Sequence, residues 1–378
     1  MSKYVVVSRA QSGIRFGKDE PLVLEQFPSV LGRVDIVVRT RLAPYEGISK
    51  PVPMGIMSEV RGDAPSLDDA VQQFSGVVQS LCPVFAFIGN SPIEDMTPEI
   101  GYEVTPGVVE RDFFQQFLVE ERLLMVTRRR ISTDLAVRVL RTFLHHPESE
   151  RIRRALAQYY QALRNWEPGQ EVLAIAHLWM GVEALAPAVL RRVLVEQQTN
   201  RSELAASWKV DERNLEAEVR KRLIMRGDTE AYATARKASD GFEHGFLGFD
   251  DLRNHSERVR AKVANYLRLS ILNELGLDAS DAAIISSPPY DKPGHLGSAK
   301  YLRGKLVAAG DEIAAAGQAY PFLKWKTTFR ELPNPDSDEV TVKMEETITG
   351  VFAEGVSFRP QSVEVWGGQE STVRRDGV

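Results

Sequence analysis

The pattern of hydrophobic and polar positions changes twice along the chain, and this predicts three regions of different architecture. In residues 1–110, short runs rich in β-branched residues at 4–7, 34–42 and 52–60 alternate with proline and glycine, which is typical of strands and turns. The segment 68–81 instead has apolar residues at helical spacing, and Pro83 should end that helix before an apolar strand at 84–88. The first region is therefore expected to be a strand-rich α+β domain.

Residues 111–277 have the 3.6-residue period of amphipathic helices, which predicts an all-α bundle. We expect helices at 111–126, 133–145, 149–166, 170–198 and 253–275, and shorter ones after Ser202, Asp211 and Asp228. The first half of 170–198 is almost entirely apolar, so this helix should lie at the centre of the bundle. Short loops between the helices favour an up-and-down arrangement.

The C-terminal part returns to strand-like patterns. Proline and glycine are frequent in 278–298, which predicts a linker, and 299–366 is expected to form a small β-rich region because apolar residues alternate at Val340, Val342 and Met344. Residues 367–378 are expected to be a disordered tail. The predicted fold class is thus a multi-domain α+β protein with a mixed N-terminal domain, a helical centre and a β-rich C-terminal region.

The composition of the chain limits the kinds of partner that the protein is expected to bind. The net charge of −5 gives no global basic field, so a nucleic acid would have to be held by a local cluster such as Arg128, Arg129 and Arg130; the alternative is a solvated loop. Cys82 is the only cysteine, which excludes an intrachain disulfide and a cysteine-rich zinc site and favours a cytoplasmic location.

Several other classes of site and partner are not expected. No apolar run approaches the roughly 20 residues of a membrane helix, so no membrane partner is expected. No HExxH, Walker or dinucleotide-binding motif is present, so we expect neither a metal nor a cofactor. Arg253 and His255, at the start of the last helix, are further candidates for nucleic-acid contact, although such a pair is also typical of a solvated helix entry.

The segment 235–246, ARKASDGFEHGF, carries the most informative chemistry. It places Arg236, Asp240 and His244 at steps of four, with Glu243 beside the histidine, and on a helix such positions share one face. Metal-free RNA cleavage needs a general base, a general acid and positive charge near the phosphate. Histidine titrates near neutral pH, so His244 is a candidate base or acid. Arg236 would bind the phosphate, and Asp240 or Glu243 would orient the imidazole.

A purely structural interpretation of the same segment stays open. Oppositely charged residues four apart form surface ion pairs that stabilise a helix by roughly 0.2–0.5 kcal/mol each. A histidine just before Gly245 would also lie at a helix C-terminus, where the helix dipole favours a cation.

The order of these helices resembles the HEPN family ("higher eukaryotes and prokaryotes nucleotide-binding"). An apolar helix bearing Glu183 precedes the Arg-to-His helix, Gly245 follows it, and a long final helix closes the set. The resemblance covers 111–277 and implies a bundle that forms homodimers and binds RNA or a nucleotide, or cleaves RNA without a metal, in phage defence or a stress response. In the family motif, four to six residues separate Arg and His. Here seven separate Arg236 from His244, and Ser239 holds the usual position of the Arg.

The sequence is compatible with two other functions. One is a non-catalytic assembly protein, in which the bundle forms a dimer interface and the β-rich ends bind another protein. The other, more remote, comes from Ser287, Pro288, Pro289 and Tyr290, which resemble the catalytic tetrad of amino-group DNA methyltransferases and follow a strand-like apolar run. The glycine-rich loop for the methyl donor and the alternating strand–helix series of that family are missing, which favours a proline-stiffened linker.

Overall fold

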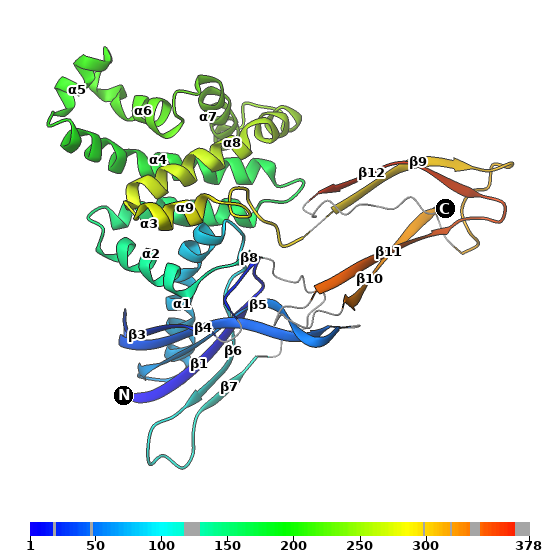
Figure 1. The fold of residues 1–378 in the computed structure, drawn as a ribbon, viewed down its shortest axis with the longest axis horizontal. Coiled ribbons are helices and arrows are strands. Elements are labelled where there is room, and N and C mark those ends of the chain that lie inside the picture. Colours follow the sequence, from blue (N-terminus) through cyan, green and yellow to red (C-terminus); the bar gives the residue numbers. More distant parts are fainter. Residues whose placement is uncertain are drawn as a thin grey trace. The chain divides into compact units, whose positions relative to one another are not determined.

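The computed structural model describes residues 1–17, 20–45, 48–116, 129–297, 299–317, 320–332 and 341–366. The chain divides into two compact units: Met1–Arg41 with Met54–Leu296, and Leu42–Pro53 with Gly297–Val378. An N-terminal sheet, a central set of helices and short C-terminal sheets follow one another along the chain (Figure 1). The predicted α+β fold class is confirmed.

A six-stranded sheet forms the N-terminal part of the first unit. Its strand order is β3-β4-β5-β1-β6-β7, and the β1–β5, β1–β6, β3–β4 and β6–β7 pairs are antiparallel. The strands are β1 (Ser2–Ala10), β3 (Leu22–Ser29), β4 (Gly32–Tyr45), β5 (Ile48–Ala64), β6 (Thr97–Glu103) and β7 (Phe113–Gln115). A short parallel pair joins β2 (Ile14–Arg15) to β8 (Arg129–Arg130).

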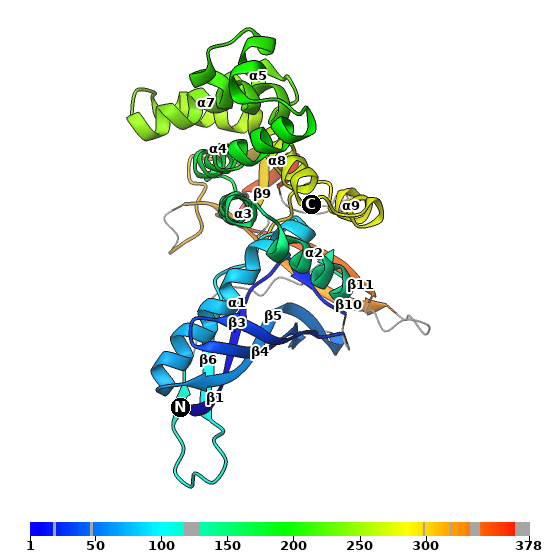
Figure 2. The ribbon, with the colours of Figure 1, turned by 90° about the vertical axis from the view of Figure 1, so that its left-hand side faces the viewer.

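Helix α1 (Leu67–Gly89) contacts β1 and β6 and lies along one face of the sheet (Figure 2). The predicted end of this helix at Pro83, and the strand at 84–88, are wrong. A proline inside a helix costs about 3 kcal/mol. However, all five residues from 84 to 88 are buried, and full burial of one large apolar side chain contributes about 1.5–3 kcal/mol. Burial of several such side chains outweighs the cost of the proline.

The helical part of the same unit contains α2 (Thr133–His145), α3 (Ser149–Arg164), α4 (Glu171–Glu196), α7 (Thr229–His244) and α8 (Phe249–Leu275). Between α4 and α7 lie α5 (Arg201–Trp208), α6 (Leu215–Val219) and a π-helical turn (Arg220–Ile224). Helix α4 contacts α3, α6, α7 and α8, as expected for the predicted central helix. The helix predicted at 111–126 is wrong at its start, because residues 113–115 form strand β7. Residues 117–128, which include the rest of that predicted helix, lie outside the described residues.

The predicted linker contains a helix, α9 (Ala279–Ser286). The carboxylate of Asp278 caps it by accepting a hydrogen bond from the Asp281 backbone N–H at 2.8 Å. Asp281 is buried and accepts two hydrogen bonds from Arg138 of α2, at 2.6 and 2.8 Å, while Ile285 is fully buried. Proline content alone therefore misled the prediction, because Ile285, which precedes the prolines, packs into the core.

Two long helices also have the length and composition of membrane spans. These are α1 and α4, so the expectation that no apolar stretch is long enough was wrong. More than half of each apolar window is buried inside the protein, and buried core helices pass the same test, so the evidence for a membrane span is weak.

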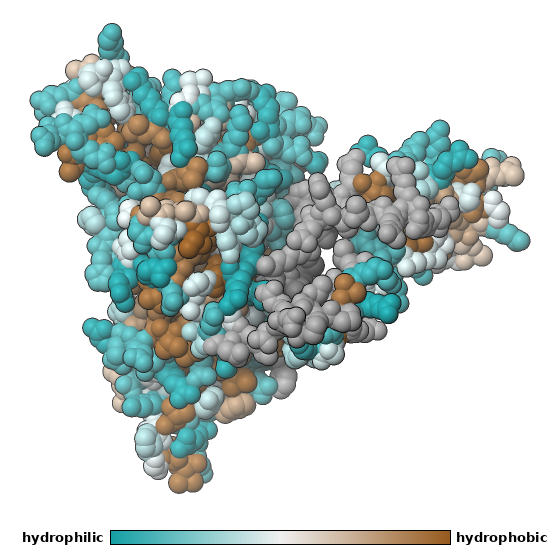
Figure 3. All heavy atoms as spheres, viewed as in Figure 1, coloured by the Kyte–Doolittle hydropathy of each residue, from teal (hydrophilic) through white to brown (hydrophobic). Residues whose placement is uncertain are grey.

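The second unit contains two antiparallel two-stranded sheets. One pairs β9 (Ala299–Val307) with β12 (Ser357–Trp366), and the other pairs β10 (Phe322–Leu332) with β11 (Thr341–Val351). We call each strand pair a hairpin, although β9 and β12 are not consecutive in the chain. The Glu331 carboxylate accepts hydrogen bonds from the backbone N–H and hydroxyl of Ser49, at 2.8 and 2.6 Å. None of the residues of 299–366 whose exposure is described is buried. In Figure 3 the described surface of these hairpins is mostly hydrophilic, with scattered apolar patches.

Candidate functional site

The segment that carries the predicted chemistry is helical, as expected. Asp228 caps the start of α7 by accepting a hydrogen bond from the Ala231 N–H at 2.9 Å. Gly245 ends the helix in a left-handed conformation (φ +67°), and its N–H donates to the Gly241 carbonyl. A side chain at Gly241 would collide with Leu247, so a glycine is required where the chain folds back into α8. We call residues 242–249 the α7–α8 corner.

The predicted stripe lies on the solvent side of α7. Residues Ala231, Ala235, Ala238 and Ser239 are buried, and successive 100° steps place the line from Arg236 through Asp240 to His244 on the opposite side. The Nε of Arg236 lies 3.3 Å from the Oδ2 of Asp240, and their side chains are 59% and 38% exposed. This pair is the surface ion pair of the structural interpretation.

The two ends of the stripe do not meet within one chain. Arg236 and His244 are eight residues apart, which corresponds to about 12 Å along the helix axis. Arg236 is paired with Asp240, which lies between the two ends, so its guanidinium and the His244 imidazole are not joined within one chain. His244 is exposed and forms no hydrogen bond or ion pair with any described residue.

Glu243 does not orient the imidazole. Its carboxylate accepts a hydrogen bond from the Ser239 hydroxyl at 3.1 Å, and Ser239 is fully buried. Ser239, which stands where the HEPN motif usually has its Arg, thus holds the Glu243 carboxylate against the helix. Three exposed phenylalanines at the corner were not anticipated: Phe242, Phe246 and Phe249 are 44%, 59% and 67% exposed.

Arg253 and His255 lie on α8, after the corner. The Nε of Arg253 is 3.9 Å from the Oε2 of Glu171, whose side chain is only 3% exposed, so Arg253 faces α4 rather than the stripe. Glu171 also accepts a hydrogen bond from the Gly169 N–H at 2.9 Å. His255 is half-buried. The two predicted contacts thus have different surroundings and do not form one basic patch with Arg236.

The predicted arginine cluster does not form an open patch. Arg128 lies outside the described residues. Arg129 donates to the carbonyls of Gly89 and Asn90, at 2.9 and 2.5 Å, and burial lowers its pKa to about 10. Arg130 forms a half-exposed ion pair with Glu20 at 3.0 Å. Arg129 is therefore a partly buried helix-capping residue, which corrects its assignment to nucleic-acid binding.

A second arginine donates hydrogen bonds to carbonyl groups at the same end of α1. Arg268 of α8 is only 4% exposed and donates to the carbonyls of Phe87, Ile88 and Ile285 at 2.8–3.3 Å. Phe87 and Ile88 lie at the C-terminal end of α1 and Ile285 at that of α9, and the negative end of a helix dipole favours a cation. Burial nevertheless lowers the pKa of Arg268. The two guanidinium groups join the sheet-bound helix to the bundle.

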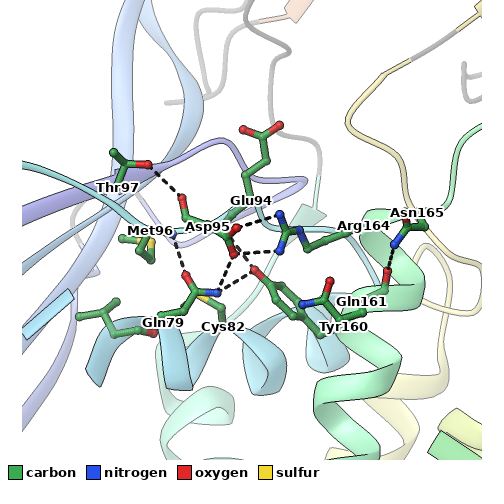
Figure 4. Close-up of polar contacts among 11 residues, drawn as sticks. Gln79, Cys82, Glu94, Asp95, Met96, Thr97, Tyr160, Gln161, Arg164 and Asn165 are labelled. Carbon is green, nitrogen blue, oxygen red and sulfur yellow. Dashed lines mark hydrogen bonds and ion pairs between the residues drawn. The ribbon is translucent and has the colours of Figure 1, made fainter. Parts of the chain in front are cut away.

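A polar cluster also joins α1 to α3 (Figure 4). Arg164 forms a bidentate pair with Asp95, at 2.8 and 2.9 Å, and the Gln79 amide donates to Asp95 and to the Tyr160 hydroxyl, each at 3.1 Å. Burial raises the pKa of Tyr160 and raises the pKa of the nearby Cys82 thiol to about 12. The polar groups of this cluster are hydrogen-bonded to one another, so the cluster holds α1 and α3 together.

The segment that resembled a methyltransferase tetrad also has a structural role. It follows helix α9, not a strand, so that part of the prediction is wrong. The Tyr290 hydroxyl donates to the Arg130 carbonyl, and the Asn90 amide donates to the Tyr290 carbonyl at 2.7 Å. The backbone and ring of Tyr290 are thus occupied in holding α9 to the end of α1.

A pocket of about 360 Å³ lies beside Tyr290. Its apolar walls include Ile88, Leu135 and Ile285, and its two cations, Arg130 and Arg138, are already paired with Glu20 and Asp281. It therefore has no unpaired charge with which to select an ionic ligand.

Within the described ranges, no group of three or more His, Cys, Asp or Glu side chains has an arrangement that could hold a metal ion. Comparison with known proteins finds no matching family model, no matching curated protein and no matching solved structure.

Proposed function

We propose that this protein is a HEPN-like RNA-binding protein that acts as a homodimer, and that RNA is cleaved at His244 only when two copies pair. The observation that carries the proposal is the exposed His244 imidazole at the capped end of α7, in line with Arg236 on the solvent face. A reacting histidine must be accessible, and this one has no described partner that would hold it away from a substrate.

Pairing would solve the distance problem within one chain. A symmetric dimer usually places the same surface of both copies around a two-fold axis. If the two α7 helices run antiparallel with the axis near Asp240, each imidazole faces the other copy's Arg236. A histidine and a guanidinium from different chains would then contact the same phosphate. The Arg236–Asp240 ion pair would have to open, which is inexpensive at an exposed site.

Labelled single-stranded RNA incubated in EDTA tests the catalytic part. We expect cleavage by the wild-type protein and a loss of about 10²–10⁴-fold in His244→Ala, the range of general acid–base catalysis. His145→Ala is the matched control, because His145 is also an exposed histidine at the end of a helix. Equal cleavage by His244→Ala and wild type would exclude the assigned role, and an RNA that is neither bound nor cleaved would refute the proposal.

A non-catalytic dimeric assembly protein is the second candidate, favoured by the exposed phenylalanines of the corner. Contiguous exposed apolar surface often marks a protein–protein contact. The double change Phe246→Ser/Phe249→Ser is expected to convert a dimer into a monomer in a light-scattering mass measurement. A dimeric wild type that neither binds nor cleaves RNA would favour assembly, whereas a wild-type monomer would count against both candidates.

A further inference from the structure

One face of the β10–β11 hairpin is basic. Side chains alternate between the two faces of a strand, so Lys324, Lys326 and Arg330 share a face of β10. The pairing register places Lys343 of β11 directly opposite Arg330. All four side chains belong to exposed residues.

Acidic residues compensate this charge only in part. Glu345 is on the same face, opposite Thr328, and lies 3.1 Å from the ammonium group of Lys343. Neither Lys326 nor Arg330 has an ion pair with a described residue. The face also presents Thr347 and Thr349, whose hydroxyls can donate hydrogen bonds, whereas the Thr328 hydroxyl already donates to the Glu345 carbonyl at 3.3 Å.

The β9–β12 hairpin has the same arrangement. Lys305 of β9 lies directly opposite Arg359 of β12, and both are exposed. Arg303 and Tyr301 follow on the same face of β9 at two-residue steps, and Tyr301 is 45% exposed. We call these surfaces of the two hairpins the basic hairpin faces.

Each basic hairpin face therefore contains two like charges directly across the strands. Such pairs destabilise an antiparallel sheet, and an anion bound between them would remove the repulsion. Two independent hairpins share this unfavourable feature, although the chain as a whole carries a net charge of −5.

We infer that the basic hairpin faces bind the phosphodiester backbone of a single-stranded nucleic acid. Two-residue steps along a strand are about 7 Å long, so the cations of β10 form an extended row that suits a linear chain of phosphates. Tyr301 offers an aromatic ring on which a base can stack. The inference deepens the proposed function by assigning a backbone-binding surface, and it depends on that function only in taking RNA as the natural strand.

Fluorescence anisotropy with a labelled 20-nucleotide oligo(dT) and the full-length protein tests the inference. This probe has no 2′-hydroxyl, so binding is measured separately from cleavage. The variant Lys326→Glu/Arg330→Glu is expected to bind about 10-fold more weakly at 50 mM salt. The slope of log affinity against log salt concentration depends on the number of phosphate contacts, and losing two contacts lowers its magnitude by about 1.4. A fourfold rise in salt concentration should therefore weaken DNA binding by the variant ~7-fold less than DNA binding by the wild type.

The control variant is Arg153→Glu/Arg154→Glu on α3, which changes the net charge equally at exposed positions. It should bind like the wild type. Arg330→Glu places a carboxylate opposite Lys343, a favourable pair, so the hairpin should be retained; an unchanged thermal melt verifies this. Lys305→Glu tests the second hairpin in the same way, with Arg359 opposite.

The outcomes separate the two proposals. Unchanged oligo(dT) affinity in both hairpin variants, or equal weakening in the control, overturns the inference even if His244-dependent RNA cleavage is found. Hairpin-dependent binding without RNA cleavage supports the inference and counts against the nuclease. Tighter, hairpin-dependent binding to phosphatidylserine vesicles than to oligo(dT) overturns the choice of nucleic acid in favour of a membrane surface.

Discussion

Arginine has different roles at different positions of this protein, and the surroundings of each residue decide which. Arg236 is exposed and pairs with a carboxylate one turn away. Arg268 is buried and donates to three main-chain carbonyls, and Arg129 donates to two more. A buried guanidinium without these acceptors would be very costly, so the carbonyls at the end of α1 and the two arginines require each other.

Replacing Arg268 by alanine should strongly destabilise the protein. The change removes the donors to the buried carbonyls of Phe87, Ile88 and Ile285, and unsatisfied buried groups cost about 1–3 kcal/mol each before any relaxation. We expect a loss of about 3 kcal/mol in the free energy of unfolding, measured with urea. Arg236→Ala should change that value by less than about 0.5 kcal/mol. Equal effects of the two substitutions would contradict the capping role.

The single thiol should be inert in the folded protein. Burial raises the pKa of Cys82 to about 12, so almost no thiolate exists at neutral pH, and the side chain is fully buried. DTNB is expected to label Cys82 only in denaturant, or at the rate of local opening of α1. Rapid stoichiometric labelling under native conditions would show that the packing of α1 against α3 is looser than described.

At the scale of the element, caps mark the helix ends, and burial carries α1 through an internal proline. Asp228 and Gly245 delimit α7 as their residue types predict, and Gly276 ends α8. In α1 the local signal at Pro83 fails because the residues after it are all buried. Local caps therefore mark the helix ends, at Ser66 and Asn90 in α1 as well, and packing decides that α1 continues through Pro83.

Substitutions at Asp228 should separate two contributions to stability, that of the capping hydrogen bond and that of the negative charge. Asp228→Ala is expected to cost about 1 kcal/mol of unfolding free energy, whereas Asp228→Asn should cost little because asparagine also caps helices. The Ala231 N–H holds the pKa of Asp228 below its ordinary value of 3.8. The extra stability from the carboxylate is therefore present above about pH 3.8 and is lost as the pH falls through the lower, folded-state pKa.

Urea titrations of the wild type and Asp228→Asn between pH 2 and pH 7 measure this effect. The difference between the two proteins should shrink only at the acidic end of the range. A difference that stayed constant down to pH 2 would show that the carboxylate has no lowered pKa in the folded state.

At the scale of the whole molecule, the two units differ in how much they bury. The first has an extensive apolar core that includes Phe85, Leu178 and Val263, each fully buried. In the second, none of the described residues of 299–366 with a known exposure is buried. Two-stranded sheets without a buried face are only marginally stable, so the hairpins should open more readily than the bundle.

Limited trypsin digestion should show this difference. We expect the first cuts in 297–366, where hairpins without a core carry exposed lysines and arginines, and later cuts in the helices of the first unit. Mass spectrometry of the earliest products identifies the positions. Adding oligo(dT) should slow cleavage after Lys326 and Arg330 if the basic hairpin faces bind nucleic acid. Early cuts within α3 or α4 would contradict the expected order.

Parts of the candidate site could be predicted from the sequence, and others could not. The helix that carries Arg236 and His244 follows from its caps and its period. The ion pair of Arg236 with Asp240 follows from their spacing. The burial of Arg129 and Arg268 depends on where the end of α1 meets β8 and α8, and no local pattern contains that contact. The basic hairpin faces could be recognised only from the strand register, which places Arg330 opposite Lys343.

The sequence by itself determined the fold class, the capped ends of α7, the end of α8 at Gly276 and the shared stripe of α7, because helical period and end caps depend on residues a few positions apart. Only the tertiary structure decided that α1 continues through Pro83, that Arg129 caps the end of α1, and that cations face one another across both hairpins. These features depend on contacts between distant segments, whose burial and charge energies exceed the local preferences of the chain.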